Sequence, residues 1–467
     1  MRNTIGLDVG TSALKVSVYS IDEDRIIHNF SLKYKEEEVG IGISPVSRFI
    51  NTIVEAINKV AENFHVASVA FSTQMYSFVV NQNNQDFVYQ WNVPWEKDLE
   101  VEKILERFVH ISGCPVDTLF PAYKILSAKK DSNFHGVIKP YGLQEAIAQA
   151  LTGKLAGDFC NLSSYGFLDV KNKIWNEELL QLAGFSVEEM PEIKKYNDPI
   201  GMINHPDINQ VYPIQLACGL GDGPSASYAS SGTSKIAANI GTSMAVRGFV
   251  NDISKMDFKK VWTYAIDEDT WVVGGISSNG SSVLDHFRKI EILKDWELNP
   301  SAADNNIRCY PWKYGERTPY WSSSLRETII GGSMNTTKND YSCAIIRGVA
   351  FSIATMYHEV CRIVDDNEML VVAGGGAKSE ILMEYLAGTL PVSIGILEDF
   401  DYLGSYGAAF AAAEALGVNP SKKQNLYKVY NPTNKYAQLY NVWKENGDQL
   451  ASFYNYLEDK KLEGQFV

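Results

Sequence analysis

The sequence lacks several features that assign chains to large protein classes. No apolar run in its 467 residues approaches the length of a membrane span, and the apolar stretch at the N-terminus contains Asp8, which argues against a signal peptide. The six cysteines show neither zinc-binding spacing nor a compact disulfide framework, so we expect buried, reduced thiols. These absences predict a cytoplasmic protein that does not act at a membrane.

Positive charge is also scarce, and it is dispersed. The formal net charge is −14, and Lys and Arg are scattered rather than clustered. Nucleic acid and anionic membranes are therefore not expected as partners, because both bind basic patches. An anionic ligand would have to be held by groups local to its site. No linker rich in Pro or Ser divides the chain, and its 45% hydrophobic and 21% charged residues are ordinary for a globular enzyme.

The tripeptide Gly-Thr-Ser occurs at 10–12 and again at 241–243, about half the chain length apart. Each copy follows a short apolar strand pattern and precedes an alternating one, so each is predicted to form the tight turn of a β-hairpin. A further copy at 232–234 follows a polar stretch and is set aside. Glycine permits the turn, and hydroxyls and free N–H groups then point into its concavity. Two facing concavities predict a clamp on a polyphosphate, and the alternative is two unrelated turns.

The repeat predicts two domains of similar size, residues 1–232 and 233–467, because the chain exceeds what one core supports. The first half shows an order of strand, strand, strand, helix and strand, which is typical of an actin-like or ribonuclease H-like ATPase domain. The segments are 3–9, 14–19, 26–30, 46–60 and 66–72. Residues 101–190 read as a mostly helical insertion that carries substrate contacts. We expect an α/β protein whose halves flank a catalytic cleft and close on a ligand.

The second half restarts at about Ser234 with further strand and helix patterns. A helix of small residues at 407–416 is suited to close approach against a neighbouring element, and Ser379 is predicted to cap a helix that ends at Thr389. The other predicted segments are strands at 271–274 and 369–373 and a helix at 281–289.

Two carboxylates are candidates for phosphoryl-transfer chemistry. Asp222 follows the apolar strand 214–220 between two glycines, so we expect an acidic turn that presents it to the cleft as a general base. Asp8 ends the first strand, two residues before the first Gly-Thr-Ser turn, where a carboxylate would face the same phosphates and hold Mg²⁺ or its water. The alternatives are an ordinary Asp-Gly turn for Asp222 and a hairpin cap for Asp8. Lys15 is either a phosphate contact or a solvated strand residue.

Eight segments, taken in chain order, closely resemble the FGGY family of carbohydrate kinases. They are residues 6–12, 72–76, 113–116, 219–223, 240–243, 315–321, 348–351 and 374–377. Within the family the fit is best to the gluconate kinase branch, through 113–116, 151–153 and 271–280. The resemblance implies two actin-like domains, with the sugar bound deep in the first and ATP with Mg²⁺ largely on the second.

The resemblance also implies roles for individual residues. Asp222 matches the catalytic base, and Asp8 matches the carboxylate near the metal. The remaining matches are Gly10, Thr11 and Ser12 for the first phosphate turn, Gly241 and Thr242 for the second, Gly331, Gly375 and Ser379 for nucleotide contacts, and Gln74, Met75 and Tyr76 for the sugar-binding strand end.

The chain departs from the family pattern after the sugar-binding strand. Members usually carry an Asp and an Arg near the substrate in a stretch that matches 91–95 here, and Val93 and Trp95 take their places. Ser322 likewise replaces an acid. A sugar carboxylate would therefore need another cation, and the candidates are Lys124 and Arg317. Trp95 either stacks on the sugar, closes the pocket or belongs to the core of a rebuilt loop.

These features predict a kinase that transfers the γ-phosphoryl of ATP to a primary hydroxyl of a linear sugar acid. Gluconate is the first candidate, and a ketose such as xylulose or another polyol is the second. The replacements at Val93 and Trp95 motivate a rival of another class, a non-catalytic sugar or nucleotide sensor. An actin-like filament or chaperone ATPase is disfavoured, because it predicts no acidic turn at the end of the first half. The expected partner is a small sugar or sugar acid, and a homodimer is open.

Overall fold

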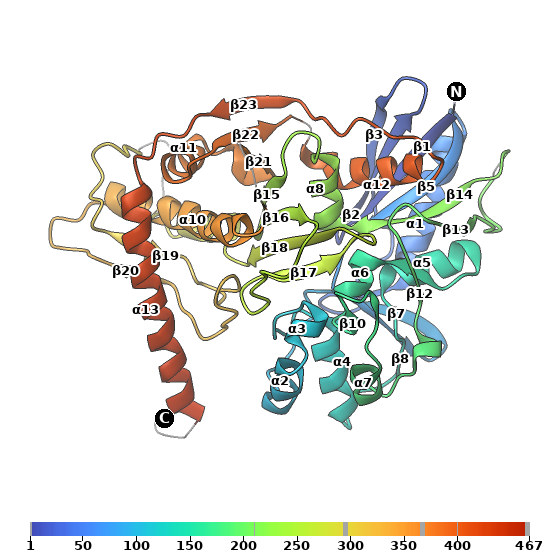
Figure 1. The fold of residues 1–467 in the computed structure, drawn as a ribbon, viewed down its shortest axis with the longest axis horizontal. Coiled ribbons are helices and arrows are strands. Elements are labelled where there is room, and N and C mark those ends of the chain that lie inside the picture. Colours follow the sequence, from blue (N-terminus) through green and yellow to red (C-terminus); the bar gives the residue numbers. More distant parts are fainter. Residues whose placement is uncertain (1, 210, 293–297, 365–368, 399, 463–467) are drawn as a thin grey trace.

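A computed structural model of the protein describes residues 2–209, 211–292, 298–364, 369–398 and 400–462, and each half of the chain is built on one mixed sheet (Figure 1). In spatial order the first sheet is β13 (Pro199–Met202), β14 (Gln215–Gly221), β5 (His65–Thr73), β1 (Arg2–Val9), β2 (Ala13–Ser20) and β3 (Arg25–Lys33). The second is β17 (Trp262–Ala265), β18 (Trp271–Ser277), β16 (Met244–Val250), β15 (Ile236–Ile240), β21 (Met369–Ala373), β22 (Ser393–Leu397) and β23 (Leu426–Tyr430).

The two sheets share one substructure, a hairpin whose first strand also pairs with a parallel neighbour. In the first half β1 pairs with β2 antiparallel and with β5 parallel. In the second half β15 pairs with β16 antiparallel and with β21 parallel. The Gly-Thr-Ser copies at 10–12 and 241–243 form the two hairpin turns, which confirms that part of the prediction.

Helices cover the sheets where the apolar periodicity predicts them. The helix α1 (Val46–Ala61) buries Phe49, Ile53 and Ile57 against the first sheet, and α5 (Leu143–Thr152) packs beside it. On the second half α9 (Ser281–Lys289) has the predicted bounds, and α11 (Glu380–Thr389) is capped by Ser379 as predicted. The long helices there are α10 (Lys338–Cys361) and α13 (Ala437–Leu462).

Two helices, α8 (Asp222–Ala229) and α12 (Leu403–Glu414), pack against each other between the sheets. Figure 1 shows α12, although near the C-terminal end of the chain, among the strands of the first half. Thr4 Oγ1 donates to the Ala409 carbonyl at 2.9 Å, and a Cβ on Gly6 would overlap the backbone of Ser405. The small residues of α12 thus permit the close approach expected for them.

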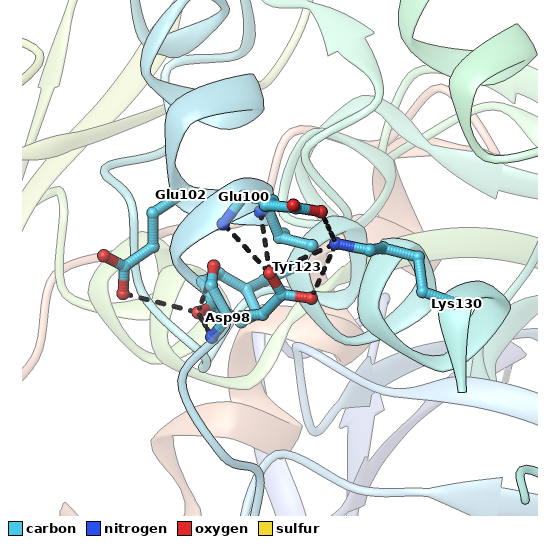
Figure 2. A network of polar contacts seen from close by, with 6 residues as sticks. Asp98, Glu100, Glu102, Tyr123 and Lys130 are labelled. Atoms are coloured by element: carbon cyan, nitrogen blue, oxygen red, sulfur yellow. Dashed lines mark hydrogen bonds and ion pairs between the residues drawn. The ribbon is translucent and has the colours of Figure 1, made fainter.

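The insertion contains α2 (Leu99–Glu106), α3 (Val109–Ser112), α4 (Pro121–Lys130), α6 (Phe159–Ser163) and α7 (Glu177–Leu182), as its helical pattern predicts. A polar network joins α2 to α4 (Figure 2). Asp98 caps α2 by accepting from two backbone N–H groups, and the Lys130 ammonium lies 3.1 Å from Asp98 and 2.6 Å from Glu100. Tyr123 accepts a hydrogen bond from the Asp98 backbone at 2.7 Å. Because these ion pairs are exposed, they orient α2 relative to α4 but add little to the free energy of unfolding.

Several short strands were not predicted from the sequence. A four-stranded sheet has the order β4 (Ile43–Pro45), β7 (Gln85–Tyr89), β6 (Phe78–Gln82) and β8 (Val137–Ile138). Two-stranded ladders join β9 (Ala156–Asp158) to β12 (Glu192–Lys194), β10 (Leu168–Asp169) to β11 (Ile174–Trp175) and β19 (Arg308–Tyr310) to β20 (Thr328–Ile330). Four of these strands, β8, β9, β10 and β11, lie within the insertion. Segments of two or three residues carry no readable periodicity.

All six cysteines are free thiols and five are buried, in agreement with the expectation of reduced thiols. Across the part of the chain that the structure describes, none of the helices is apolar over a length that would cross a bilayer.

Candidate active site

A cavity of about 710 Å³ opens between the two halves and is lined by both. Strand ends of both sheets and the starts of α8 and α12 form its walls. The lining includes Asp8, Gly10, Thr11, Gln74, Met75 and Tyr76 from the first half, Asp222 and Gly223 at the start of α8, Thr242, Ser243, Arg247 and Arg317 from the second half, and Leu403 and Gly404 at the start of α12. This volume suits a small-molecule ligand.

Asp8 lies at the end of β1, where the pairing of strands sets its neighbours. It is opposite Lys15 on β2 and Ser72 on β5, and Ser72 Oγ donates to Asp8 Oδ1 at 2.8 Å. Burial raises the pKa of Asp8 to about 6, against the lowering effects of Lys15 and Ser72. The Lys15 ammonium donates to the Asp401 carbonyl at 2.7 Å, so a protein partner already holds it. Gly404 matters here because a Cβ at that position would lie 2.8 Å from the Asp8 carboxyl carbon.

The raised pKa of Asp8 predicts that ligand-free Asp8→Asn is more stable than the wild type at neutral pH. The folded state holds the Asp8 proton up to about pH 6, whereas the unfolded state releases it near pH 4. The wild type therefore loses stability as pH rises through this window, by up to about 3 kcal/mol, and the variant does not. Urea unfolding of both proteins at pH 7.5 and pH 4.5 measures the difference, which should shrink at the lower pH. A difference independent of pH would contradict the assignment.

Asp222 does not lie in a turn, as its glycine neighbours predict, but is the first residue of α8, with Gly221 as the N-cap. Pro224 is compatible with this helix because its first turn needs no N–H donors. Asp222 Oδ1 accepts from the Gly223 N–H at 2.7 Å. Burial raises the pKa of Asp222, and the Arg247 guanidinium opposes that shift. A carboxylate with a raised pKa that faces a cavity is suited to accept a proton.

The two Gly-Thr-Ser turns contribute Thr11 and Thr242 to the cavity. Within the described ranges, no hydrogen bond engages either threonine hydroxyl. Two hydrogen bonds from the start of α9 hold the second turn in place. The Gly241 carbonyl accepts from Ser281 N at 2.8 Å, and the Thr242 carbonyl accepts from Ser282 Oγ at 2.9 Å. Ser12 and Gly241 belong to the same turns but are not part of the cavity lining.

This set of groups fits the phosphates of a nucleotide and an accompanying Mg²⁺. Free hydroxyls and turn N–H groups bind phosphate oxygens, and a single carboxylate such as Asp8 matches the way proteins hold Mg²⁺ together with phosphates. No group of three or more His, Cys, Asp or Glu residues in the described segments could hold a metal on its own. A metal at this site would therefore depend on the nucleotide.

The end of β5 brings Gln74, Met75 and Tyr76 into the cavity lining, and the Gln74 N–H donates to the Val9 carbonyl at 3.2 Å, beside the first turn. The Gln74 side chain is buried, and among the described residues neither its amide nitrogen nor its amide oxygen has a partner. Such an unpaired buried amide indicates a polar ligand, because leaving it unmatched costs free energy. The Tyr76 hydroxyl accepts from the Tyr264 hydroxyl of β17 at 3.2 Å, so this end also joins the two halves.

Comparison with protein families finds two matching domains, which together cover most of the chain. The N-terminal domain of the FGGY family of carbohydrate kinases matches residues 3–228, and its C-terminal domain matches residues 228–416. This chain belongs to the FGGY family. The FGGY kinase chain is 22% identical to the gluconokinase of Bacillus licheniformis, with 99% of this chain and 96% of that protein covered. It is 25% identical to the xylulose kinase of Staphylococcus xylosus, with 95% and 99% covered.

Solved structures confirm the two-domain kinase fold expected for the chain. The gluconate kinase from Lactobacillus acidophilus has a TM-score of 0.84 at 22% identity, with 98% of this FGGY chain and 99% of that chain covered. The family acts on carbohydrates with ATP as the phosphoryl donor, so the kinase acts on a small sugar substrate.

Of the two cations predicted to hold a sugar carboxylate in this FGGY kinase, only Arg317 lines the cavity. Its Nη1 donates to Ser278 Oγ at 2.7 Å, and its Nε lies 3.6 Å from Asp117 Oδ1. Lys124 is buried and is not part of the lining, and it donates to the backbone carbonyls of Gln90 and Trp91 at 3.3 and 3.1 Å. Burial lowers the pKa of Lys124 to about 7. Lys124 is therefore not assigned to the proposed substrate-binding site.

The three residues matched to nucleotide contacts in FGGY kinases also lie outside the cavity lining. Gly331 follows β20 with φ of 88°. Ser379 uses its hydroxyl to accept from Leu382 N at 3.4 Å as the cap of α11. No described atom lies within 4 Å of a Cβ built on Gly375, which leaves that position open to a ligand. Their nucleotide role stays a prediction.

Val93 and Trp95, which stand in place of the Asp and Arg of the FGGY pattern, pack against hydrophobic side chains. Trp95 contacts the rings of Phe78 and Phe134, each at 6.3 Å between centroids, and Val93 packs against the same cluster. This favours the core role for Trp95, whereas Trp91 lines the cavity. Ser322 is hydrogen-bonded to Asn455 of α13 at 2.7 Å.

Arg247 was not among the site residues predicted from the sequence of this kinase. It lies on β16, four residues after the second Gly-Thr-Ser turn, and it lines the cavity beside Asp222. The available signal was a single charged residue in an otherwise apolar strand, Met244–Val250.

Proposed function

We propose that this carbohydrate kinase transfers the γ-phosphoryl group of ATP to a primary hydroxyl of a linear sugar acid, with gluconate as the first candidate and 6-phosphogluconate as the product. One observation carries the proposal. Asp222, Asp8 and residues of both Gly-Thr-Ser turns line one cavity, which also includes Gln74 with its unpaired amide. The gluconokinase relatives support gluconate, and the xylulose kinase relatives support a ketose such as xylulose as the alternative.

Each residue has a role that follows from its place. Asp222 accepts the proton of the attacking hydroxyl, and its raised pKa brings it closer to the working pH of the reaction. Thr11 and Thr242 donate hydrogen bonds to phosphate oxygens, and Asp8 would hold Mg²⁺ or its water. Bound ATP supplies the phosphoryl group and Mg²⁺ offsets its charge. Gln74 orients the sugar, and the walls from both halves exclude water.

The direct test measures ADP formation with a panel of sugar acids, ketoses and polyols. We expect turnover to depend on the added sugar, with gluconate among the best substrates. Turnover of ketoses alone would select the xylulose alternative. If ATP binds but no compound is turned over, the rival that Val93 and Trp95 motivate, a sugar or nucleotide sensor, replaces the kinase proposal.

Thr242→Val is expected to raise the KM for ATP by about 10-fold or more and to change the KM for the sugar little. The substitution removes one hydrogen bond to a charged group, worth about 1.5–3 kcal/mol. Thr242 belongs to the second half of the chain, to which the nucleotide is assigned. Initial rates with each substrate varied in turn measure both constants.

The matched control is Thr233→Val in the third Gly-Thr-Ser copy. The Thr233 hydroxyl accepts from Gln424 N at 2.8 Å, outside the cavity, so this variant loses a structural hydrogen bond but no ligand contact. If Thr242→Val changed the KM for the sugar alone, the assignment of the nucleotide to the second half and of the sugar to the first would be reversed.

A further inference from the structure

Within the part of the chain that the structure describes, Arg247 differs from Arg317 and Lys124 in having no anionic or carbonyl partner. Its Nε is buried without a hydrogen bond, and among the described acids none lies within 4 Å of its guanidinium. Arg317, by contrast, is already engaged by Ser278 and Asp117, and Lys124 is engaged by two carbonyls. Arg247 is therefore the cation whose charge is left for a ligand.

The surroundings of Arg247 hold its side chain toward the cavity. β16 alternates, with Val246 and Gly248 facing the core under α10, while Arg247 faces the opposite side. The guanidinium carbon lies 5.8 Å from the Trp262 ring centroid, and Trp262 in turn stacks on Tyr264 at 4.4 Å. This aromatic support restricts an otherwise flexible side chain.

Gly223 provides the space that brings the guanidinium next to α8. A Cβ at Gly223 would overlap Nη2 of Arg247, so any other residue would push the two apart. Arg247 lines the same cavity as Asp222 and Tyr76, and its charge opposes the rise that burial causes in the pKa of both groups.

We propose that Arg247 binds the carboxylate of the substrate, which makes an aldonic acid rather than a neutral polyol or ketose the preferred acceptor. The inference rests on the proposed function and deepens it by assigning the acid group to one side chain. A guanidinium presents two parallel N–H donors that match a carboxylate, and the partly buried site strengthens this pairing. The unpaired Nε and the absence of a nearby acid then have one explanation, because the substrate supplies the anion.

The test compares gluconate with glucitol, which differs from it in carrying a CH₂OH group in place of the carboxylate. For Arg247→Leu we expect kcat/KM to fall by about 10- to 100-fold with gluconate, the range for a lost hydrogen bond to a charged group. The fall with glucitol should be clearly smaller, because only the effect of Arg247 on the pKa of Asp222 is then lost. Arg247→Lys, which keeps the charge and loses the fork, should give an intermediate loss with gluconate.

Two further variants serve as comparisons. Arg317→Ala removes the other cation of the cavity, and Lys124→Met removes the buried cation outside it. A loss selective for gluconate in Arg317→Ala but not in Arg247→Leu would overturn the inference. Equal losses with both substrates in Arg247→Leu would also overturn it and would assign Arg247 to the base or the phosphate.

Binding measurements separate failure of the inference from failure of the proposed function. If the wild type phosphorylates only neutral sugars, the kinase proposal stands and the role of Arg247 is wrong. If it phosphorylates nothing, calorimetry with gluconate and glucitol still tests Arg247. Gluconate binding that is lost in Arg247→Leu and kept in Asp222→Asn supports the role, and binding kept in both overturns it.

Discussion

Asp222→Asn is expected to lower kcat by about 10²- to 10⁴-fold while leaving the fold and ATP binding intact, the usual contribution of a general base. Asp222 stands at the first position of α8 and faces the cavity. Asparagine has nearly the same shape and can keep the hydrogen bond from the Gly223 N–H, but it cannot accept a proton from a sugar hydroxyl. The loss should therefore appear in kcat rather than in the affinity for either substrate.

Steady-state rates, ATP titration and thermal unfolding of the variant together check this result. Asp285→Asn is the matched control, because Asp285 lies exposed on α9 and pairs with Arg288 at 2.8 Å. If Asp222→Asn retained more than a third of the wild-type rate, another group would have to be the base.

Gly6→Ala is expected to lower the free energy of unfolding by about 2–4 kcal/mol, near the upper end for an overpacked site. A Cβ at Gly6 would overlap the Ser405 carbonyl and the Ala409 amide of α12. These are backbone atoms of a buried helix, so the helix itself must move. That movement would weaken the hydrogen bonds from Thr4 to Ala409 and between Ser17 and Ser405.

Chemical unfolding of Gly6→Ala and of Gly375→Ala separates this clash from a general effect of replacing glycine. No atom lies within 4 Å of a Cβ on Gly375, so that variant should stay within about 0.5 kcal/mol of the wild type. Equal stability of Gly6→Ala and the wild type would mean that α12 does not pack on β1 as described.

The sequence predicted what short-range patterns encode. The period of the apolar residues in 46–61, the two glycine turns and the Ser379 cap depend on neighbours within a few residues, and all three are present. The start of α8 was misread because Gly-Asp-Gly-Pro is typical of turns, whereas Gly221 and Pro224 here suit a helix N-terminus.

Residues whose placement depends on tertiary contacts could not be assigned in this way. Lys124 has a charge suited to an anion, but its helix points it at the carbonyls of Gln90 and Trp91. Arg247 reaches the cavity only because a strand of the second half lies against Gly223 of α8. Trp95 joins Phe78 and Phe134, which come from different parts of the first half. The sequence pattern alone does not show which residues distant in the chain come into contact.

The position of α12 affects how the chain is made. Thr4 and its partner Ala409 are separated by 405 residues. At about 5–20 residues per second, β1 leaves the ribosome roughly 20–80 s before the helix that covers it. The last strand of that sheet, β14, ends at Gly221, so for about the second half of this interval the whole sheet has been synthesised while its face around Gly6 has no cover from α12. Completion of the N-terminal half therefore waits until α12, which lies in the other half of the sequence, has been translated.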